Sequence, residues 1–151
     1  MRNQRILGIC LVVCLLLLGA SVYAQVVRPT HSGAAWQISF IHVKPGMSTA
    51  YDKYLASEWK KQQDALKAAG IVLSYKVIQT EAHSPNDWDL MLMSEYKDLA
   101  SVEANEDKVD ALLQKSVGGD EKIMQGYKDR SEIREVLGTR LAREVILEPK
   151  K

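Results

Sequence analysis

The pattern of apolar and polar residues changes its period along the chain, and each change marks a predicted element. Residues 36–43 alternate with the two-residue period of a β-strand, and Pro45 and Gly46 end that strand. Residues 47–69 then carry an apolar stripe at three- and four-residue steps, which is typical of an amphipathic helix. Gly70 suits the left-handed residue that often closes such a helix. A tight turn between the two segments is predicted to fold the helix back over the strand.

The same order of strand and helix recurs downstream, with a hairpin in between. Short alternating segments predict strands, and longer stripes predict helices. The predicted elements after the first helix are a strand at 71–79, a strand at 88–96, a helix at 98–117, a short helix at 120–127 and a strand at 139–147. This β-α-β-β-α-β order predicts an α+β domain of the ferredoxin-like class, with four antiparallel strands and helices on one face.

Features of these elements carry a resemblance to a known superfamily. The first strand ends in Val43-Lys44-Pro45-Gly46, the first helix carries Tyr51, Tyr54 and Trp59, and the last strand follows a charged run. In these features the chain resembles the dimeric α+β barrel proteins, which include antibiotic-biosynthesis monooxygenases and stress-response barrel proteins. The resemblance implies a homodimer in which two sheets pack face to face. Because this superfamily contains enzymes and non-enzymes alike, it does not imply one activity.

The alternation also predicts on which face of the sheet each side chain lies. The more apolar face of the first strand is predicted to pack against the helices; it carries Trp36, Ile38, Phe40 and His42. The opposite face, which helices on one side leave uncovered, is predicted to form the dimer interface. It carries Ile41, Val43, Val72, Ile78, Met91 and Met93.

The N-terminal residues are predicted to lie outside this domain. Arg2 and Arg5 precede an apolar run at 6–20, and Ala24 supplies the small residue before a cleavage site. These features predict a secretory signal peptide, and hence an exported protein, periplasmic or secreted, that leaves the membrane after cleavage. The alternative is an uncleaved anchor, but the run is shorter than the roughly 18–20 residues that span a bilayer. The predicted organisation is a signal peptide at 1–24, a flexible leader at 25–35 and a folded domain at 36–148.

Composition and charge narrow the classes of partner and cofactor. The chain has 20 basic and 19 acidic residues and no basic block, which argues against a nucleic-acid partner. Both cysteines, Cys10 and Cys14, fall in the predicted signal peptide, so the predicted domain has no disulfide and no thiolate. His42 and His83 are far apart and match no metal-binding motif. Haem-degrading members of the superfamily use a histidine on the second helix, and residues 99–117 contain none. No metal or cofactor is therefore predicted.

One part of the domain is a candidate for binding or chemistry. With the first helix folded over the first strand, Tyr54 and Trp59 are predicted to lie near His42, with Trp88 close by. These four residues are the candidate binding set for a small, planar and largely apolar ligand, and His42 is the candidate acid–base group. The alternative is that the aromatic residues are ordinary core and His42 a strand-end residue. Two functions follow: a small-ligand- or partner-binding barrel, or a cofactor-independent, monooxygenase-like enzyme acting on a planar apolar substrate.

Overall fold

The computed structural model describes residues 29–81, 84 and 87–148. The predicted signal peptide, residues 1–24, lies outside the described residues, and so does His83. Within the described ranges, no helix is both long enough and apolar enough to cross a membrane.

The chain divides into two compact units. One consists of Met1–His31 and Leu147–Lys151. In its described part, the amide of Glu148 donates to the carbonyl of Pro29 at 2.8 Å. The other unit, Ser32–Ile146, holds the helices and the sites discussed below.

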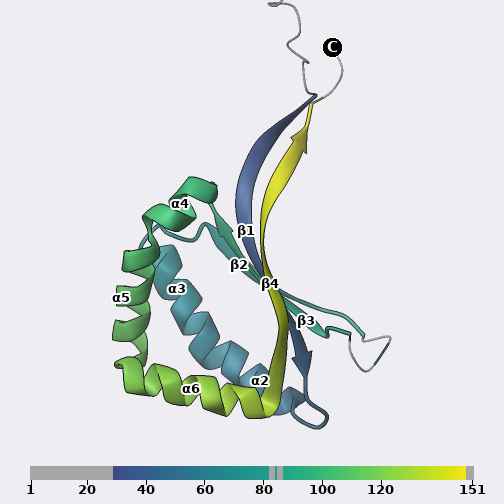
Figure 1. Ribbon diagram of the computed structural model, residues 1–151, viewed down its shortest axis with the longest axis vertical. Coiled ribbons are helices and arrows are strands. Elements are labelled where there is room, and N and C mark those ends of the chain that lie inside the picture. The colour runs from purple at the N-terminus through teal and green to yellow at the C-terminus, as the bar shows by residue number, and fades with distance from the viewer. Residues whose placement is uncertain (1–28, 82–83, 85–86, 149–151) are drawn as a thin grey trace, which may run out of the picture. The chain divides into compact units, whose positions relative to one another are not determined.

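The sheet has four strands in the order β2-β3-β1-β4. Its strands are β1 (Thr30–Val43), β2 (Ser74–Gln79), β3 (Leu90–Tyr96) and β4 (Arg134–Leu147). Strand β3 pairs antiparallel with both β1 and β2, and Figure 1 shows β4 running opposite to β1. Two β-α-β units that interleave in this order make a ferredoxin-like fold, so the predicted fold class is confirmed.

The helices cover one face of the sheet (Figure 1). They are α2 (Ser48–Tyr54), η2 (Leu55–Trp59), α3 (Lys60–Ala68), α4 (Leu99–Ala104), α5 (Glu106–Val117) and α6 (Asp120–Ile133). The first three form a continuous rod, in which η2 is a single turn of π-helix and Gly70, with φ of 71°, follows the end as predicted. We call the side of the sheet that bears these helices the helix-facing side, and the other side the open face.

Two clusters of buried side chains hold the helices to the sheet. The first contains Ile41, Tyr51, Leu55, Leu90 and Leu92. The second contains Ala35, Leu66, Ile71, Val72 and Tyr96. Each cluster joins strand residues to the first helical rod or to the loop that follows it, so the rod is fixed at both of its ends.

The two faces of β1 are opposite to the prediction. Ile41 is 0 % exposed and packs with Tyr51 of α2 and Leu55 of η2. Because side chains alternate along a strand, the odd-numbered residues of β1 lie on the helix-facing side. The prediction that the even-numbered residues of this strand pack against the helices is therefore wrong. The residues concerned are Trp36, Ile38, Phe40 and His42, and they lie on the open face.

The predicted dimer face needs the matching correction. Ile41 belongs to the buried cluster, Val43 packs against it, and Val72, only 1 % exposed, belongs to the second cluster. None of these three can face a second copy. The strand register places Met91 opposite Phe40 and Ile78 opposite Met91, so Ile78 and Met91 do lie on the open face.

Strands β1 and β4 are longer than predicted because they pair with each other. Strand β1 begins at Thr30, so residues 30–35 belong to the sheet and were wrongly assigned to a flexible leader. Strand β4 begins at Arg134, directly after α6. Gly33 shows how closely the two strands approach, because a Cβ built there would lie 2.6 Å from the carboxylate of Glu144.

Candidate functional site

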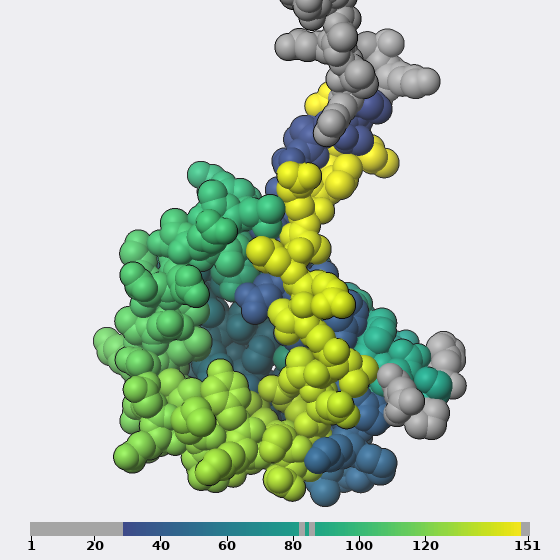
Figure 2. Space-filling view, viewed as in Figure 1, coloured from purple at the N-terminus to yellow at the C-terminus, as the bar shows by residue number. Residues whose placement is uncertain are grey.

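The helices leave part of the helix-facing side uncovered. Gln37 lies in the middle of β1, a central strand, and points to the helix-facing side, yet its side chain is exposed. Figure 2 shows the reason as a hollow between the helices α4–α6 and β4. A central strand under a complete helical layer would present buried apolar side chains at this position.

Part of this space is a cavity of about 170 Å³ against the sheet, which we call the central hollow. Its polar surface comes from the strands and from the rod, and its apolar surface comes largely from the helices. The polar residues are Gln37, Ser39, Gln62, Gln63 and Ser94. The remaining residues are Trp59, Leu66, Leu92, Tyr96, Val109 and Leu113. The central hollow thus joins an apolar wall to a row of uncharged hydrogen-bonding groups.

Hydrogen bonds fix several of these polar groups in place. The hydroxyl of Ser94 donates to Gln63 Oε1 at 2.8 Å, and the hydroxyl of Tyr96 donates to Gln37 Oε1 at 3.3 Å. Burial raises the pKa of Tyr96, which keeps its phenol protonated as a donor at neutral pH. The side-chain amides of Gln37 and Gln63 use their oxygens in these bonds, and the NH₂ group of each is a donor for a ligand.

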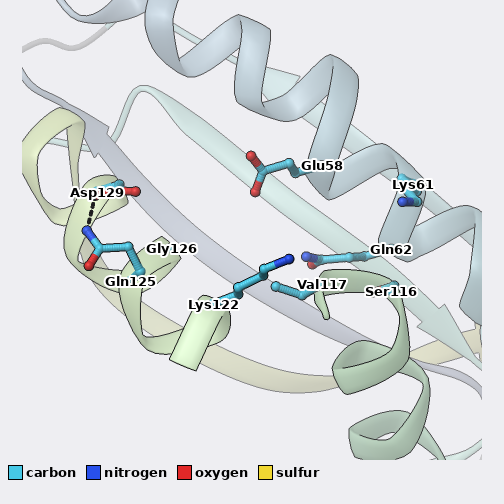
Figure 3. Close-up of a pocket in the computed structure, with 9 residues that line it drawn as sticks. All are labelled: Glu58, Lys61, Gln62, Ser116, Val117, Lys122, Gln125, Gly126 and Asp129. Atoms are coloured by element: carbon cyan, nitrogen blue, oxygen red, sulfur yellow. Dashed lines mark hydrogen bonds between the residues drawn. The ribbon is translucent and has the colours of Figure 1, made fainter. Parts of the chain in front are cut away.

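Outside the central hollow the space widens into two adjoining grooves of about 290 and 270 Å³ between the first rod and helices α5 and α6. Both grooves are lined by Glu58, Gln62 and Lys122, and Gln62 also lines the central hollow. Figure 3 shows Lys122 and Gln62 pointing toward one another across the groove, with Glu58 on the same side as Gln62. Charged side chains of both signs therefore surround the entrance, while the interior is uncharged.

The π-helical turn η2 forms the wall between entrance and interior. It contains Glu58, which lines the grooves, and Trp59, which lines the central hollow. The hydroxyl of Ser57 donates to the carbonyl of Lys53 at 2.6 Å, a side-chain contact that accompanies local distortion of a helix. Single π-turns of this kind occur often at functional sites, because the extra residue reorients the side chains that follow.

The structure separates the four residues predicted to bind a ligand. Trp59 lines the central hollow, and Tyr54 packs against the first buried cluster, with the centroid of its ring 5.7 Å from that of Tyr51. His42 and Trp88 lie elsewhere: Trp88 contacts Phe40, which is on the open face, with ring centroids 5.6 Å apart. The prediction of one cleft shared by all four residues is wrong, because it placed β1 the wrong way round.

His42 has a carboxylate neighbour of its own. Its Nδ1 lies 3.2 Å from Asp89 Oδ2, and the same oxygen accepts a hydrogen bond from the amide of Val43 at 2.6 Å. The pair sits where β1 ends and β3 begins, away from the central hollow. An oxygenase that uses His42 beside Tyr54 and Trp59 therefore finds no support in this arrangement. Across the described ranges, no three His, Cys, Asp or Glu side chains are grouped to hold a metal ion.

Sequence reasoning missed the polar residues of the central hollow. Gln37 and Ser39 interrupt the apolar residues at 34–41 of β1, and Ser94 follows four apolar residues in β3. A polar residue in a central strand was the available signal, since such strands usually carry apolar residues on a covered face.

Comparisons with known proteins find similar solved structures but no matching family. No family model and no curated protein matches the chain. Among solved structures, HapK from Hahella chejuensis is similar, with 13% identity, a TM-score of 0.47, and coverage of 73% of this chain and 91% of HapK. A dimeric, ferredoxin-like protein of unknown function from Bacteroides fragilis gives 15% identity, a TM-score of 0.38 and coverage of 76% and 96%. PA3566 from Pseudomonas aeruginosa gives 14% identity, a TM-score of 0.41 and coverage of 77% and 96%.

Proposed function

We propose that the protein binds a small, uncharged organic molecule in the central hollow and that it does so as a homodimer. The observation that supports ligand binding is the pair of polar residues on the helix-facing side of a central strand, the exposed Gln37 and the half-buried Ser39. Helices that served only to bury the sheet would close over this pair, because apolar packing there stabilises the fold. An open space with fixed hydrogen-bonding groups suits a ligand better than it suits a core.

The lining indicates the chemistry of that ligand. Trp59 and Leu66 offer apolar surface, and the glutamine and serine side chains of the lining offer neutral donors and acceptors. An apolar molecule with one polar edge matches both surfaces. The central hollow alone is small, but with its adjoining grooves it reaches the range of roughly 300–1,000 Å³ that is typical of ligand sites.

Untargeted mass spectrometry of small molecules extracted from the purified protein tests this proposal. The Gln37→Trp variant fills the central hollow and is expected to lose the bound molecule. Gln79→Trp is the matched control, because Gln79 is also an exposed glutamine on the helix-facing side but lines none of the cavities described above. A molecule present in wild type and in Gln79→Trp but absent from Gln37→Trp supports the proposal. The same extract from all three proteins contradicts it.

The open face supports the second half of the proposal. It presents apolar side chains from three neighbouring strands, and the described residues place no helix over it. Its apolar members include Trp36, Ile38, Phe40, Ile78, Met91 and Met93. A face of this kind on a small domain marks an interface. A second copy of the same sheet is the partner that would cover it with matching shape, since a twofold axis pairs a surface with itself.

We also propose export, on the sequence of residues 1–24 alone. The basic start, the apolar run and the small residue at Ala24 support it. Protein isolated from the exported fraction is expected to have an intact mass that begins at Gln25. A mass that retains Met1 contradicts cleavage.

A further inference from the structure

A second cavity, of about 410 Å³, lies where α6 ends and β4 begins. Three cationic side chains line it, namely Lys44, Arg130 and Arg134, together with a single acidic residue, Glu135. Tyr127 and Val136 supply its apolar surface. We call this space the arginine cavity. Its excess of positive charge contrasts with the uncharged interior of the central hollow.

Both arginines lack an anionic partner. Within the part of the chain that the structure describes, neither Arg130 nor Arg134 forms an ion pair with an Asp or a Glu. The Nε–H group of each is buried and donates to no group of the described residues. A buried donor without an acceptor is unfavourable, and more so on a charged group, so each of the two guanidinium groups favours an anion nearby.

Aromatic rings hold the two guanidinium groups. Arg130 lies over the ring of Tyr127 at 4.7 Å and over that of Tyr54 at 5.2 Å, and Arg134 lies over the ring of Tyr51 at 5.6 Å. Contacts with ring faces restrain a guanidinium group but leave the N–H donors around its edge free. The arginines are therefore positioned before a ligand arrives, which lowers the entropy lost on binding.

We propose that the arginine cavity binds the carboxylate of an organic acid. The planar fork of N–H donors on Arg matches the two oxygens of a carboxylate, whereas a compact inorganic anion would leave the apolar surface at Tyr127 and Val136 unused. Lys44 adds a third positive charge at the same cavity. This cavity shares no lining residue with the central hollow, but Tyr127 and Arg130 also line one of the outer grooves.

Titration with benzoate, followed by the NMR signals of the arginine Nε–Hε groups, tests the proposal. Benzoate is expected to shift the signals of Arg130 and Arg134 and to bind at least about tenfold more tightly than benzamide, which has the same shape without the charge. It is also expected to bind more tightly than inorganic phosphate, which has the charge without the ring. Equal affinity for benzamide or for phosphate overturns the assignment, and so does an absence of shifts.

Two variants locate the site. Arg130→Gln and Arg134→Gln are each expected to weaken benzoate binding about tenfold or more. Arg143→Gln is the matched control, because Arg143 is exposed on β4 and lines none of the cavities. Unchanged affinity in both test variants, or an equal loss in Arg143→Gln, contradicts the site. If a test variant fails to fold, the comparison of the three ligands on wild type still decides the outcome.

Discussion

Tyr51 carries the most deeply buried phenol of the first cluster. Its side chain is 0 % exposed, and its hydroxyl has no hydrogen-bond partner among the described residues. Burial raises the pKa of Tyr51 to about 12, against a partly opposing effect of the positive charge on Arg134. A neutral hydroxyl is thus tolerated here, and a phenolate would not be.

This predicts a loss of stability in alkaline solution. Between pH 10 and about pH 12 the phenol of Tyr51 ionises in the unfolded chain but not in the folded one. Ionisation stabilises the unfolded state, so the free energy of unfolding falls as pH rises. Two pKa units correspond to about 2–3 kcal/mol. Tyr51→Phe is expected to avoid this part of the loss and to be neutral or slightly stabilising at pH 7, since it removes an unpartnered hydroxyl.

Urea unfolding at a series of pH values measures the effect. Tyr127→Phe is the control, because Tyr127 is 58% exposed. An alkaline loss in Tyr51→Phe as large as in wild type would show that other groups cause it.

Trp59 has contacts on one side and the central hollow on the other. Its ring meets that of Tyr75 edge to face, with centroids 5.4 Å apart, and the side chain is half-buried. Trp59→Ala is expected to lower the free energy of unfolding by about 2 kcal/mol, less than the 3–5 kcal/mol typical of a fully buried tryptophan. Chemical denaturation checks this value, and a loss above 4 kcal/mol would mean that the hollow is closed in solution.

At the same scale, two polar residues explain why the faces of β1 could not be read from the sequence. Ranking by hydropathy placed Phe40 and its even-numbered neighbours toward the helices, because Gln37 and Ser39 make the other side more polar. The ranking assumes that helices cover the more apolar side. Here the helix-facing side includes a hollow, so it tolerates polar groups, and the open face keeps the larger apolar residues.

At the scale of elements, local signals predicted where the helices start but not their breaks or ends. The helix predicted at 98–117 divides into α4 and α5 at Asn105, and the helix predicted at 120–127 extends to Ile133. Asp98 was predicted to begin a helix, and it caps α4: its carboxylate accepts the amide of Ser101 at 2.7 Å, and Ser101 Oγ accepts the amide of Asp98 at 3.2 Å.

The lengths of β1 and β4 depend on each other because the two strands pair. The pattern of residues within either strand does not show how far that pairing extends. The π-turn could not be predicted either, because Leu55 and Trp59 are four residues apart, as they would be in an ordinary α-helical stripe.

The cap of α4 makes a direct prediction. Asp98→Ala removes the acceptor for the Ser101 amide and is expected to cost about 1 kcal/mol of unfolding free energy. Asp107→Ala is a matched control, because Asp107 is an exposed aspartate in the first turn of α5 and caps no helix. Equal losses in the two variants, measured by thermal unfolding, would show that general charge at the helix starts matters and the cap does not.

At the scale of the whole molecule, the order of elements was enough to predict the fold, because few topologies satisfy β-α-β-β-α-β with short connections. The central hollow and the arginine cavity could not be predicted, since each combines residues from segments far apart in the chain. In the proposed function the two faces of the sheet have different roles. The helix-facing side is proposed to bind the ligand, and the open face is proposed to bind a second copy.

Static light scattering on two neighbouring variants tests this division of roles most directly. Ser39 and Phe40 are adjacent in β1 but lie on opposite faces of the sheet. Phe40→Glu would bury an unpaired charge between two sheets and is expected to give a monomer, whereas Ser39→Glu places the charge in the open hollow and is expected to leave a dimer, as in wild type. A monomeric wild-type protein, or a dimer in Phe40→Glu, would contradict the division.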